Sequence, residues 1–528
     1  MRTEMSTARW VSLFAFAGVI TVAGFGCSSS VSGGGTAGKG GGGGKAGATA
    51  GAGGHAGAGT AGATDGGVDS PTDTGGGDSA DTAPPGKEVV YANAGTSLYV
   101  FDFNASDGTL TLKPALTNVL AQVPQYAVMD QPAQKYLYAG VTIEPANYID
   151  SFSIDPVAGG LTRIPPPAVD AGADAGDAGA TDAAQPQGTV SPNGRAIYVS
   201  LSKDNKYLLA VHNVTKSYTV FNLGTDGTVG SPVAQTGGTD MNVGNFVHQI
   251  RVDPSGKFVY ICDRGTDPTT TTGADGGVVN VPEGLGHIRS FTFANGVLTP
   301  LQTIEYPAGY GPRHLDFHPT KPWVYVSVGR GNQLITYTMA TDGMLTQVDK
   351  KTSLDSDAEA AKLPIYAQDS VNGQQACGIM VHPSGKWLWI SNTNRQVVPF
   401  TPDAGVGDGG SDGGDAAPPA PQQVYVGTGE NNVALFSIDQ TTGIPTWVAS
   451  ADSHGFVPRT FALDPSGKYL IAANQKQVNK LVGGVVTPVL PNLSVFSVAA
   501  DGKLTFVKTT DLSTGDIFWV GGRTVTGP

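Results

Sequence analysis

The segment HQIRVDPSGKFVYICD (residues 248–263) contains two short runs of β-branched and aromatic residues separated by a turn. The turn DPSG has a proline that fixes φ, a glycine that tolerates positive φ, and an aspartate that can accept hydrogen bonds from nearby backbone amides. The run FVYIC is uniformly apolar, as in a strand that is covered on both faces. The segment therefore predicts two strands joined by a tight turn.

This turn and the strand after it recur along the chain. Copies begin at Gln131, Ser202, Asp253, His318, His382 and Asp464. A second element, in which an aromatic residue leads a strand into a Gly-containing turn, begins at Phe101, Phe152, Phe221, Phe291, Tyr337, Phe436 and Phe496. A period of about 40 to 50 residues built from short strands is typical of a β-propeller.

Seven copies of the second element predict a single all-β domain, a seven-bladed β-propeller over residues 87–528. The first blade lacks the first element. We expect its strand at residues 89–92 to pair with the C-terminal strand near residues 517–520 and close the ring. No stretch of the sequence indicates a long amphipathic helix.

Composition limits the kinds of ligand. The chain of 528 residues has 75 glycines, 35 prolines and a net charge of −13, without a basic stripe, which argues against nucleic-acid binding. Low-complexity tracts at about 168–187, 266–286 and 400–422 lengthen the repeat spacing and are interpreted as loop insertions. Their aspartates do not match a calcium-binding loop, and no His/carboxylate cluster has ligand spacing, so we expect no metal and no cofactor.

The N-terminus is typical of an exported protein. Residues 1–27 contain a short apolar run that ends in AGFGC, which resembles a bacterial lipobox with Cys27 as the lipidated residue; secretion with cleavage nearby is the alternative. Residues 28–86 bury almost nothing and are expected to form a disordered tether. The prediction is a lipoprotein of the cell envelope, periplasmic or on the outer surface, that contacts the membrane only through its anchor.

Aligning the repeats on their turns identifies residues that face the central channel. The ring lies five residues before each turn and reads Tyr126, Ile197, His248, Arg313, Cys377 and Arg459; a competing turn at Ser191 would replace Ile197 by Pro186. Two arginines and a histidine in such a ring predict a site for a small anionic ligand, with bidentate arginine contacts and histidine as proton carrier. The alternative is that these side chains bind backbone carbonyls and water. His314 points to the opposite strand face from Arg313, and would pack between blades or touch ligand.

The same motifs resemble the seven-bladed lactonase propellers, which include bacterial 6-phosphogluconolactonases and fungal muconate-lactonizing enzymes. GPRHLDFHP, HQIRVDPSGKFVYICDRGTD and RTFALDPSGKYLIAAN carry the resemblance, together with the seven second elements, over residues 87 to the C-terminus. The resemblance implies that His248 matches the family's catalytic histidine and that Arg313 and Arg459 match its anion-binding arginines. Gly329 stands where the family has a glutamate.

Two hypotheses of function follow. In the first, an exported lactonase of carbohydrate metabolism hydrolyses a lactone. His248 would act as general base, Arg313 and Arg459 would hold the anionic group, and His314 and Tyr126 would contact substrate. In the second, a surface or periplasmic propeller binds a ligand or protein and has lost catalysis with the glutamate. The sequence does not decide between them, nor does it indicate an oligomeric state.

Overall fold

The computed structural model describes residues 87–526, apart from 121–123, 144–145, 167–188, 237–242, 273–276, 283, 356–372, 395, 402–419, 426–428 and 514. The described residues belong to one compact unit, Ala80–Pro528. The predicted export signal, the Cys27 lipidation site, the tether and Pro186 lie outside the described residues.

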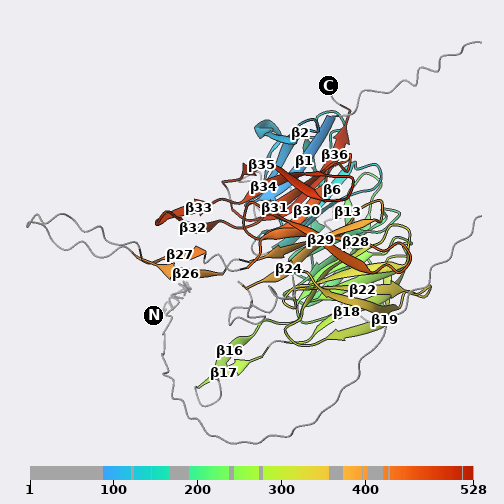
Figure 1. Cartoon of the computed structure of the whole chain (residues 1–528). Helices are drawn as coiled ribbons and strands as arrows, with labels where there is room; N and C mark the ends of the chain where they lie inside the picture. Colours follow the sequence, from blue (N-terminus) through green and yellow to red (C-terminus); the bar gives the residue numbers. More distant parts are fainter. Residues whose placement is uncertain are drawn as a thin grey trace, which may run out of the picture. The chain divides into compact units, whose positions relative to one another are not determined.

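Seven antiparallel sheets form the seven predicted blades (Figure 1). Blades 1 to 3, written from the innermost strand outward, are β36 (Ile517–Val525), β1 (Lys87–Ala94), β2 (Ser97–Asn104) and β3 (Thr109–Leu112); β5 (Ala127–Met129), β6 (Tyr136–Ile143), β7 (Ala146–Ile154) and β8 (Leu161–Ile164); and β10 (Ala196–Leu201), β11 (Tyr207–His212), β12 (Ser217–Leu223) and β13 (Val229–Pro232). Two short strands extend the first two sheets: β4 (Asn118–Val119) pairs with β2, and β9 (Thr189–Val190) pairs with β7.

The remaining four blades repeat the same order. They are β14 (Val247–Val252), β15 (Phe258–Asp263), β18 (Gly286–Ala294) and β19 (Val297–Tyr306); β20 (Pro312–Phe317), β21 (Trp323–Val328), β22 (Gln333–Met339) and β23 (Leu345–Thr352); β24 (Gln375–Val381), β25 (Trp387–Thr393), β28 (Asn432–Ile438) and β29 (Pro445–Asp452); and β30 (Pro458–Leu463), β31 (Tyr469–Asn474), β34 (Asn492–Val498) and β35 (Leu504–Asp511). A single 3-10 turn, η1 (Pro114–Leu116), is the helical element of the described part. Within that part, no helix has the length and apolar character that a membrane crossing requires.

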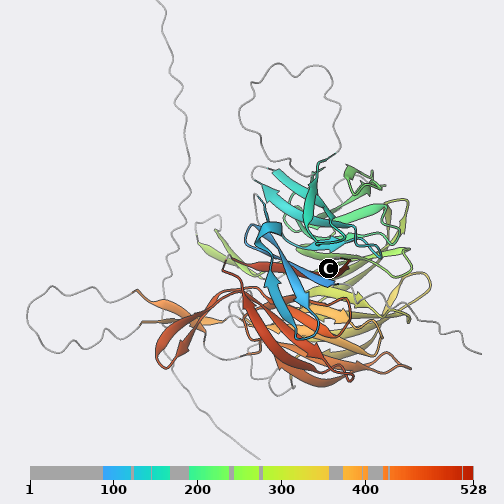
Figure 2. The ribbon, with the colours of Figure 1, turned by 90° about the horizontal axis from the view of Figure 1, so that it is seen from above.

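The ring closes as the sequence predicts. Strand β36 pairs antiparallel with β1, with Val520 opposite Ala92, so the two ends of the described chain share blade 1. In Figure 2 the blue N-terminal strands accordingly lie beside the red C-terminal strand. The buried amide of Asn93 connects this closure to blade 2, because it accepts hydrogen bonds from the backbone N–H groups of Phe518 and Trp519 and donates to the carbonyls of Pro124 and Gln125.

Hydrogen bonds between the two repeat elements connect neighbouring blades. A buried aromatic residue of the second strand donates a hydrogen bond to a glycine carbonyl in the outer turn of the next blade, as in Tyr325 Oη to Gly443 O at 2.9 Å. Tyr91, Tyr260 and Trp389 make the same contact with Gly159, Gly343 and Gly502. These glycines have φ values of 74° to 86°, a region that residues with a Cβ seldom occupy, which explains why the turn keeps glycine.

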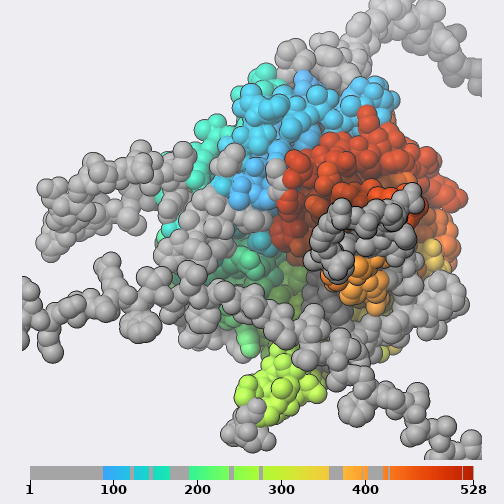
Figure 3. Space-filling model, turned by 90° about the vertical axis from the view of Figure 1, so that its left-hand side faces the viewer, coloured from blue at the N-terminus to red at the C-terminus, as the bar shows by residue number. Residues whose placement is uncertain are grey.

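Three extra hairpins leave the same connection, between the second and third strands, in blades 4, 6 and 7. They are β16 (Thr269–Thr272) with β17 (Val278–Val281), β26 (Val397–Phe400) with β27 (Gln422–Tyr425), and β32 (Val478–Val482) with β33 (Val485–Val489). Figure 1 shows them projecting from one side of the propeller, and Figure 3 looks onto that side, with β16–β17 in yellow-green. The first two lie in or flank the low-complexity insertions, so part of these insertions is strand.

Candidate active site

A β-bulge places several of the ring residues at the central channel. In β14, Val247 and Gln249 face the consecutive residues Asp263 and Cys262 of β15, so His248 is the extra residue of its strand. The register shifts in the same way at Ile197, Arg313, Arg459 and Phe518. A bulge turns the extra side chain away from the regular alternation, and bulges are common next to active sites.

These bulged residues line one cavity of about 300 Å³. The structure thus brings together His248, Arg313 and Arg459, which come from blades 4, 5 and 7. Ile197, Cys377 and Phe518 line the same cavity. Its volume is at the lower end of the range for small-molecule sites. No group of three or more side chains suited to a metal ion occurs among the described residues.

His248 is buried and held in its neutral form. Burial lowers its pKa well below the ordinary value of 6.5, and the positive charges of Arg313 and Arg459, with the neighbouring His314, lower it further. Its buried Nδ1 atom makes no hydrogen bond to any described residue. A neutral imidazole of this kind can accept a proton.

Arginine side chains give the cavity its positive character. Arg313 donates from Nη1 to Oε1 of Gln375 at 3.0 Å. Arg459 lies 5.1 Å from the ring centre of Phe518, and no carboxylate of the described residues pairs with it. Burial, and then the charge of Arg313, lower the pKa of Arg459 to about 10, so the guanidinium remains charged near neutral pH.

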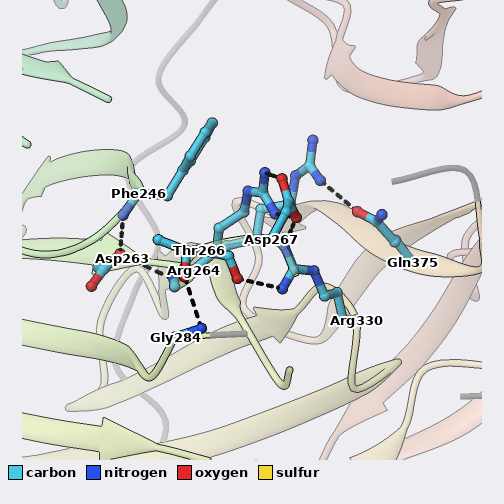
Figure 4. Close-up of polar contacts among 10 residues, drawn as sticks. Phe246, Asp263, Arg264, Thr266, Asp267, Gly284, Arg330 and Gln375 are labelled. Atoms are coloured by element: carbon cyan, nitrogen blue, oxygen red, sulfur yellow. Dashed lines mark hydrogen bonds and ion pairs between the residues drawn. The ribbon is translucent and has the colours of Figure 1, made fainter. Parts of the chain in front are cut away.

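Sequence reasoning missed a further arginine cluster, shown in Figure 4. Arg264, which lines the cavity, makes two 2.8 Å hydrogen bonds to the carboxylate of Asp267 and lies 4.1 Å from the ring centre of Phe246. The buried Arg330 also pairs with Asp267 and donates to the Thr266 carbonyl at 3.1 Å. Asp267 therefore joins two cations beside the cavity.

A buried carboxylate shapes the loop before His248. Asp263 accepts hydrogen bonds from the backbone N–H groups of Asn245 and Phe246, and from that of Gly265. Its Oδ2 atom also lies 2.9 Å from Nδ1 of His287. The sequence feature that could have predicted this part of the site is the polar run Asp263-Arg264-Gly265, which follows a run of apolar residues.

Tyr126 and His314 lie below the cavity. They line a void of about 10 Å³ between it and a second chamber further along the channel, and they contact that chamber as well. His314 meets His248 edge to face, and Tyr126 stacks on Tyr198 with ring centres 3.9 Å apart. These two predicted substrate contacts therefore do not line the cavity itself but the void between the two chambers.

Gly329 lies beside Arg313 and leaves room for a side chain. An added Cβ would lie 3.8 Å from the Cβ of Arg313 and 3.4 Å from the Gly311 carbonyl oxygen, which are ordinary contacts. The glycine is thus not required by local packing. A Cβ therefore fits at the position where the resemblance leads one to expect a glutamate.

Comparison with known proteins identifies the family. The sequence model of the family described as "Lactonase, 7-bladed beta-propeller" matches residues 87–276 and 269–482. The 6-phosphogluconolactonase of Bacillus subtilis is 22% identical over 283 residues, which is 53% of this chain and 64% of that protein. The 6-phosphogluconolactonase of Formosa agariphila is 22% identical over 396 residues, 74% of this chain and 88% of that protein.

Among solved structures, a periplasmic gluconolactonase from Pseudomonas aeruginosa superposes with a TM-score of 0.56 at 17% identity, covering 83% of this chain and 99% of that one. This likeness concerns the fold. Fold and site together define a seven-bladed β-propeller with a cationic pocket on its axis. The family match extends over more than half of the sequence, and the chain belongs to the seven-bladed β-propeller lactonase family. The resemblance seen in the sequence is thereby confirmed.

Proposed function

We propose that this protein hydrolyses a lactone in the cavity that His248, Arg313 and Arg459 line. The observation that carries the proposal is the meeting of these three side chains, from three blades, around one space of about 300 Å³. Water would attack the lactone carbonyl carbon and the ring C–O bond would break. His248 would take the proton from water and return it to the leaving alkoxide, giving a hydroxy acid.

The arginines have two roles in this reaction. Arg313 and Arg459 hold the anionic group of the substrate, and they stabilise the negative charge that develops on the carbonyl oxygen. In the empty site they keep the pKa of His248 low, which makes it a weak base. A bound anion offsets their charge, so the basicity of His248 rises only when substrate is present.

The proposed location is the cell envelope. The AGFGC sequence ending at Cys27 supports export, and the similar gluconolactonase from Pseudomonas aeruginosa is described as periplasmic. Phosphorylated sugars are intermediates of the cytoplasm, so we propose an unphosphorylated sugar-acid lactone that carries a free carboxylate, such as an aldarolactone, as substrate. Cys27→Ser should move the full-length protein from the detergent phase to the aqueous phase of a Triton X-114 partition; an unchanged partition would contradict lipidation.

A panel of aldonolactones and carboxylate-bearing aldarolactones tests the reaction on the full-length protein. We expect turnover in the wild type and losses of about 100-fold or more in His248→Gln and Arg313→Ala. His382→Gln is the matched control, because His382 lies in a surface turn with its Nδ1 2.7 Å from Ser384 Oγ. Turnover that survives both site substitutions would overturn the assignment. Anion binding without any turnover would support the non-catalytic alternative.

A further inference from the structure

The channel contains a second chamber, called the lower chamber below, that the proposed reaction does not use. The cavity lined by His248, Arg313 and Arg459 is called the upper cavity. The volume of the lower chamber is about 210 Å³, the space of roughly seven water molecules. Its lining includes residues that follow the bulges on the same innermost strands, namely Gln249 and Arg251 of β14, Asp316 of β20, Ile379 and Met380 of β24, and Phe461 of β30. The side chain of Arg251 keeps 31% of its surface accessible.

One fixed ion pair supplies the charge of this chamber. Arg251 donates from Nη2 to Oδ1 of Asp316 at 2.8 Å, and Oδ2 of Asp316 accepts the Val381 N–H at 2.8 Å. The pair joins blades 4, 5 and 6 and has no net charge. A guanidinium has five N–H donors and each carboxylate oxygen has a second lone pair, so both partners can still bind a hydroxyl group.

Part of the chamber wall is aromatic and aliphatic. Tyr126 and Tyr198 stack with their planes 18° apart, and Ile379, Met380 and Phe461 also line the space. The Tyr198 hydroxyl accepts from Nε2 of Gln249 at 3.1 Å, and Oε1 of Gln249 accepts the Leu315 N–H. The wall is therefore held in place by hydrogen bonds from two strands.

We propose that the lower chamber is a second ligand site for a neutral, hydroxyl-rich ring molecule of monosaccharide size. The C–H face of such a ring packs on the aromatic and aliphatic wall, and its hydroxyls bind the Arg251–Asp316 pair. An anion would meet the carboxylate of Asp316, and a cation would meet Arg251, so the pair disfavours either charge. The cationic upper cavity, by contrast, favours an anion.

The proposal does not depend on the proposed lactonase activity, because its test uses neutral compounds with no lactone ring. D-Glucose, D-galactose, D-mannose and myo-inositol would be titrated into the full-length protein by calorimetry, with saturation-transfer NMR as a second readout. We expect at least one to bind saturably in the wild type. Met380→Trp fills the chamber and should abolish binding, while Arg313→Ala changes the upper cavity and should leave it unchanged.

Three results would overturn the proposal. These are the absence of saturable binding by all four compounds, undiminished binding in Met380→Trp, and loss of binding in Arg313→Ala, which would place the ligand in the upper cavity. If Met380→Trp does not fold, Ile379→Phe provides a smaller filling of the same space and is expected to weaken binding. The melting temperature of each variant without ligand distinguishes lost folding from lost binding.

Discussion

The rings of His248 and His314 meet edge to face with their centres 4.9 Å apart, between the two chambers of the channel. Both are buried, and burial followed by the charge of Arg313 holds the pKa of each imidazole well below 6.5. Arg459 acts on both in the same direction. The protonation of the proposed base is therefore set by burial and by the charges of the neighbouring arginines, and this has measurable consequences.

Removing the charge of Arg313 should raise the pKa of His248. Arg313 is the largest charged cause of the depression, so Arg313→Gln shifts the imidazole titration toward higher pH, while burial keeps it below 6.5. Inorganic phosphate bound to the wild type should act in the same direction. Nitrogen-15 NMR of the histidine side chains measures both effects.

Arg195→Gln is the control for this titration. Arg195 also lines the cavity, but its charge is not among the causes of the His248 shift. We expect an unchanged titration in this variant. Equal shifts of the His248 pKa in Arg195→Gln and Arg313→Gln would mean that the total charge of the cavity, rather than the charge at position 313, sets that pKa.

His212 should make the fold sensitive to acid. Burial lowers its pKa to about 4, whereas in the unfolded chain it titrates near 6.5. Between these values the unfolded state binds more protons, so stability falls as the pH drops from about 6.5 to 4, by about 3 kcal/mol in total. The free energy of unfolding of His212→Gln should fall less than that of the wild type between pH 6.5 and pH 4. Urea unfolding at several pH values measures this difference.

The exposed His454 provides the comparison for that measurement, since its side chain meets water in the folded protein. His454→Gln is expected to keep the wild-type dependence on pH. If His212→Gln kept the wild-type dependence of unfolding free energy on pH, other groups, His248 and His314 first among them, would account for the acid sensitivity.

Much of the fold could be read from the sequence because its repeats have a physical cause. Asp253 accepts the backbone N–H groups of Ser255, Lys257 and Phe258, and the ring nitrogen of His318 takes the same role, so the turn recurs with different residues. Matching these turns located His248, Arg313 and Arg459, because the innermost strands of blades 4, 5 and 7 have their bulges at the same distance from the turn.

Matching the turns did not locate three other residues in or beside the cavity, namely Phe518, Arg264 and Arg330. Phe518 lines the cavity from blade 1, whose innermost strand comes from the C-terminal end without a copy of the turn to align. Arg264 and Arg330 follow the second strand of their blades, where sequence position says little about what a side chain reaches. Their meeting at Asp267 depends on the packing of two blades.

Asp267→Asn should destabilise the protein and make it depend on anions. The variant leaves Arg330, which is 3% exposed, and Arg264 as neighbouring cations without their shared carboxylate. We expect a loss of about 2 kcal/mol in the free energy of unfolding. Sulfate should restore more stability to the variant than to the wild type, because the ion replaces the missing charge.

The matched substitution is Asp501→Asn, which removes the carboxylate of an exposed pair with Lys503. It should leave both stability and the response to sulfate unchanged. If Asp267→Asn were as stable as Asp501→Asn without sulfate, Asp267 would not be holding the two arginines.

Gly329→Glu should fold and should weaken anion binding. The space around Gly329 accepts a Cβ, and the new carboxylate comes close to Arg313, whose charge it would offset. Gly329→Gln has the same size without the charge. We expect the dissociation constant for gluconate to be about tenfold higher in the glutamate variant than in the glutamine variant. Equal constants would place the carboxylate away from Arg313.

Asn93→Ala should cost the most stability of these changes, because its amide links the ring-closing strand β36 to blade 2. Its Nδ2 donates to the carbonyls of Pro124 and Gln125 at 2.6 Å each, and its Oδ1 accepts the N–H groups of Phe518 and Trp519 at 2.9 and 2.7 Å. Alanine would leave these buried groups without their partner, and we expect a loss of about 3 kcal/mol or more in the free energy of unfolding.

The same substitution should also weaken anion binding, since Phe518 and Gln125 line the upper cavity and lose their common support. Asn222→Ala serves as its control: Asn222 is an exposed residue whose amide makes a single 3.0 Å hydrogen bond, to Ser231, within its own blade. Urea unfolding and gluconate titration of both variants measure the two effects. A stability loss in Asn93→Ala no larger than that of Asn222→Ala would show that β36 is held by its pairing with β1 alone.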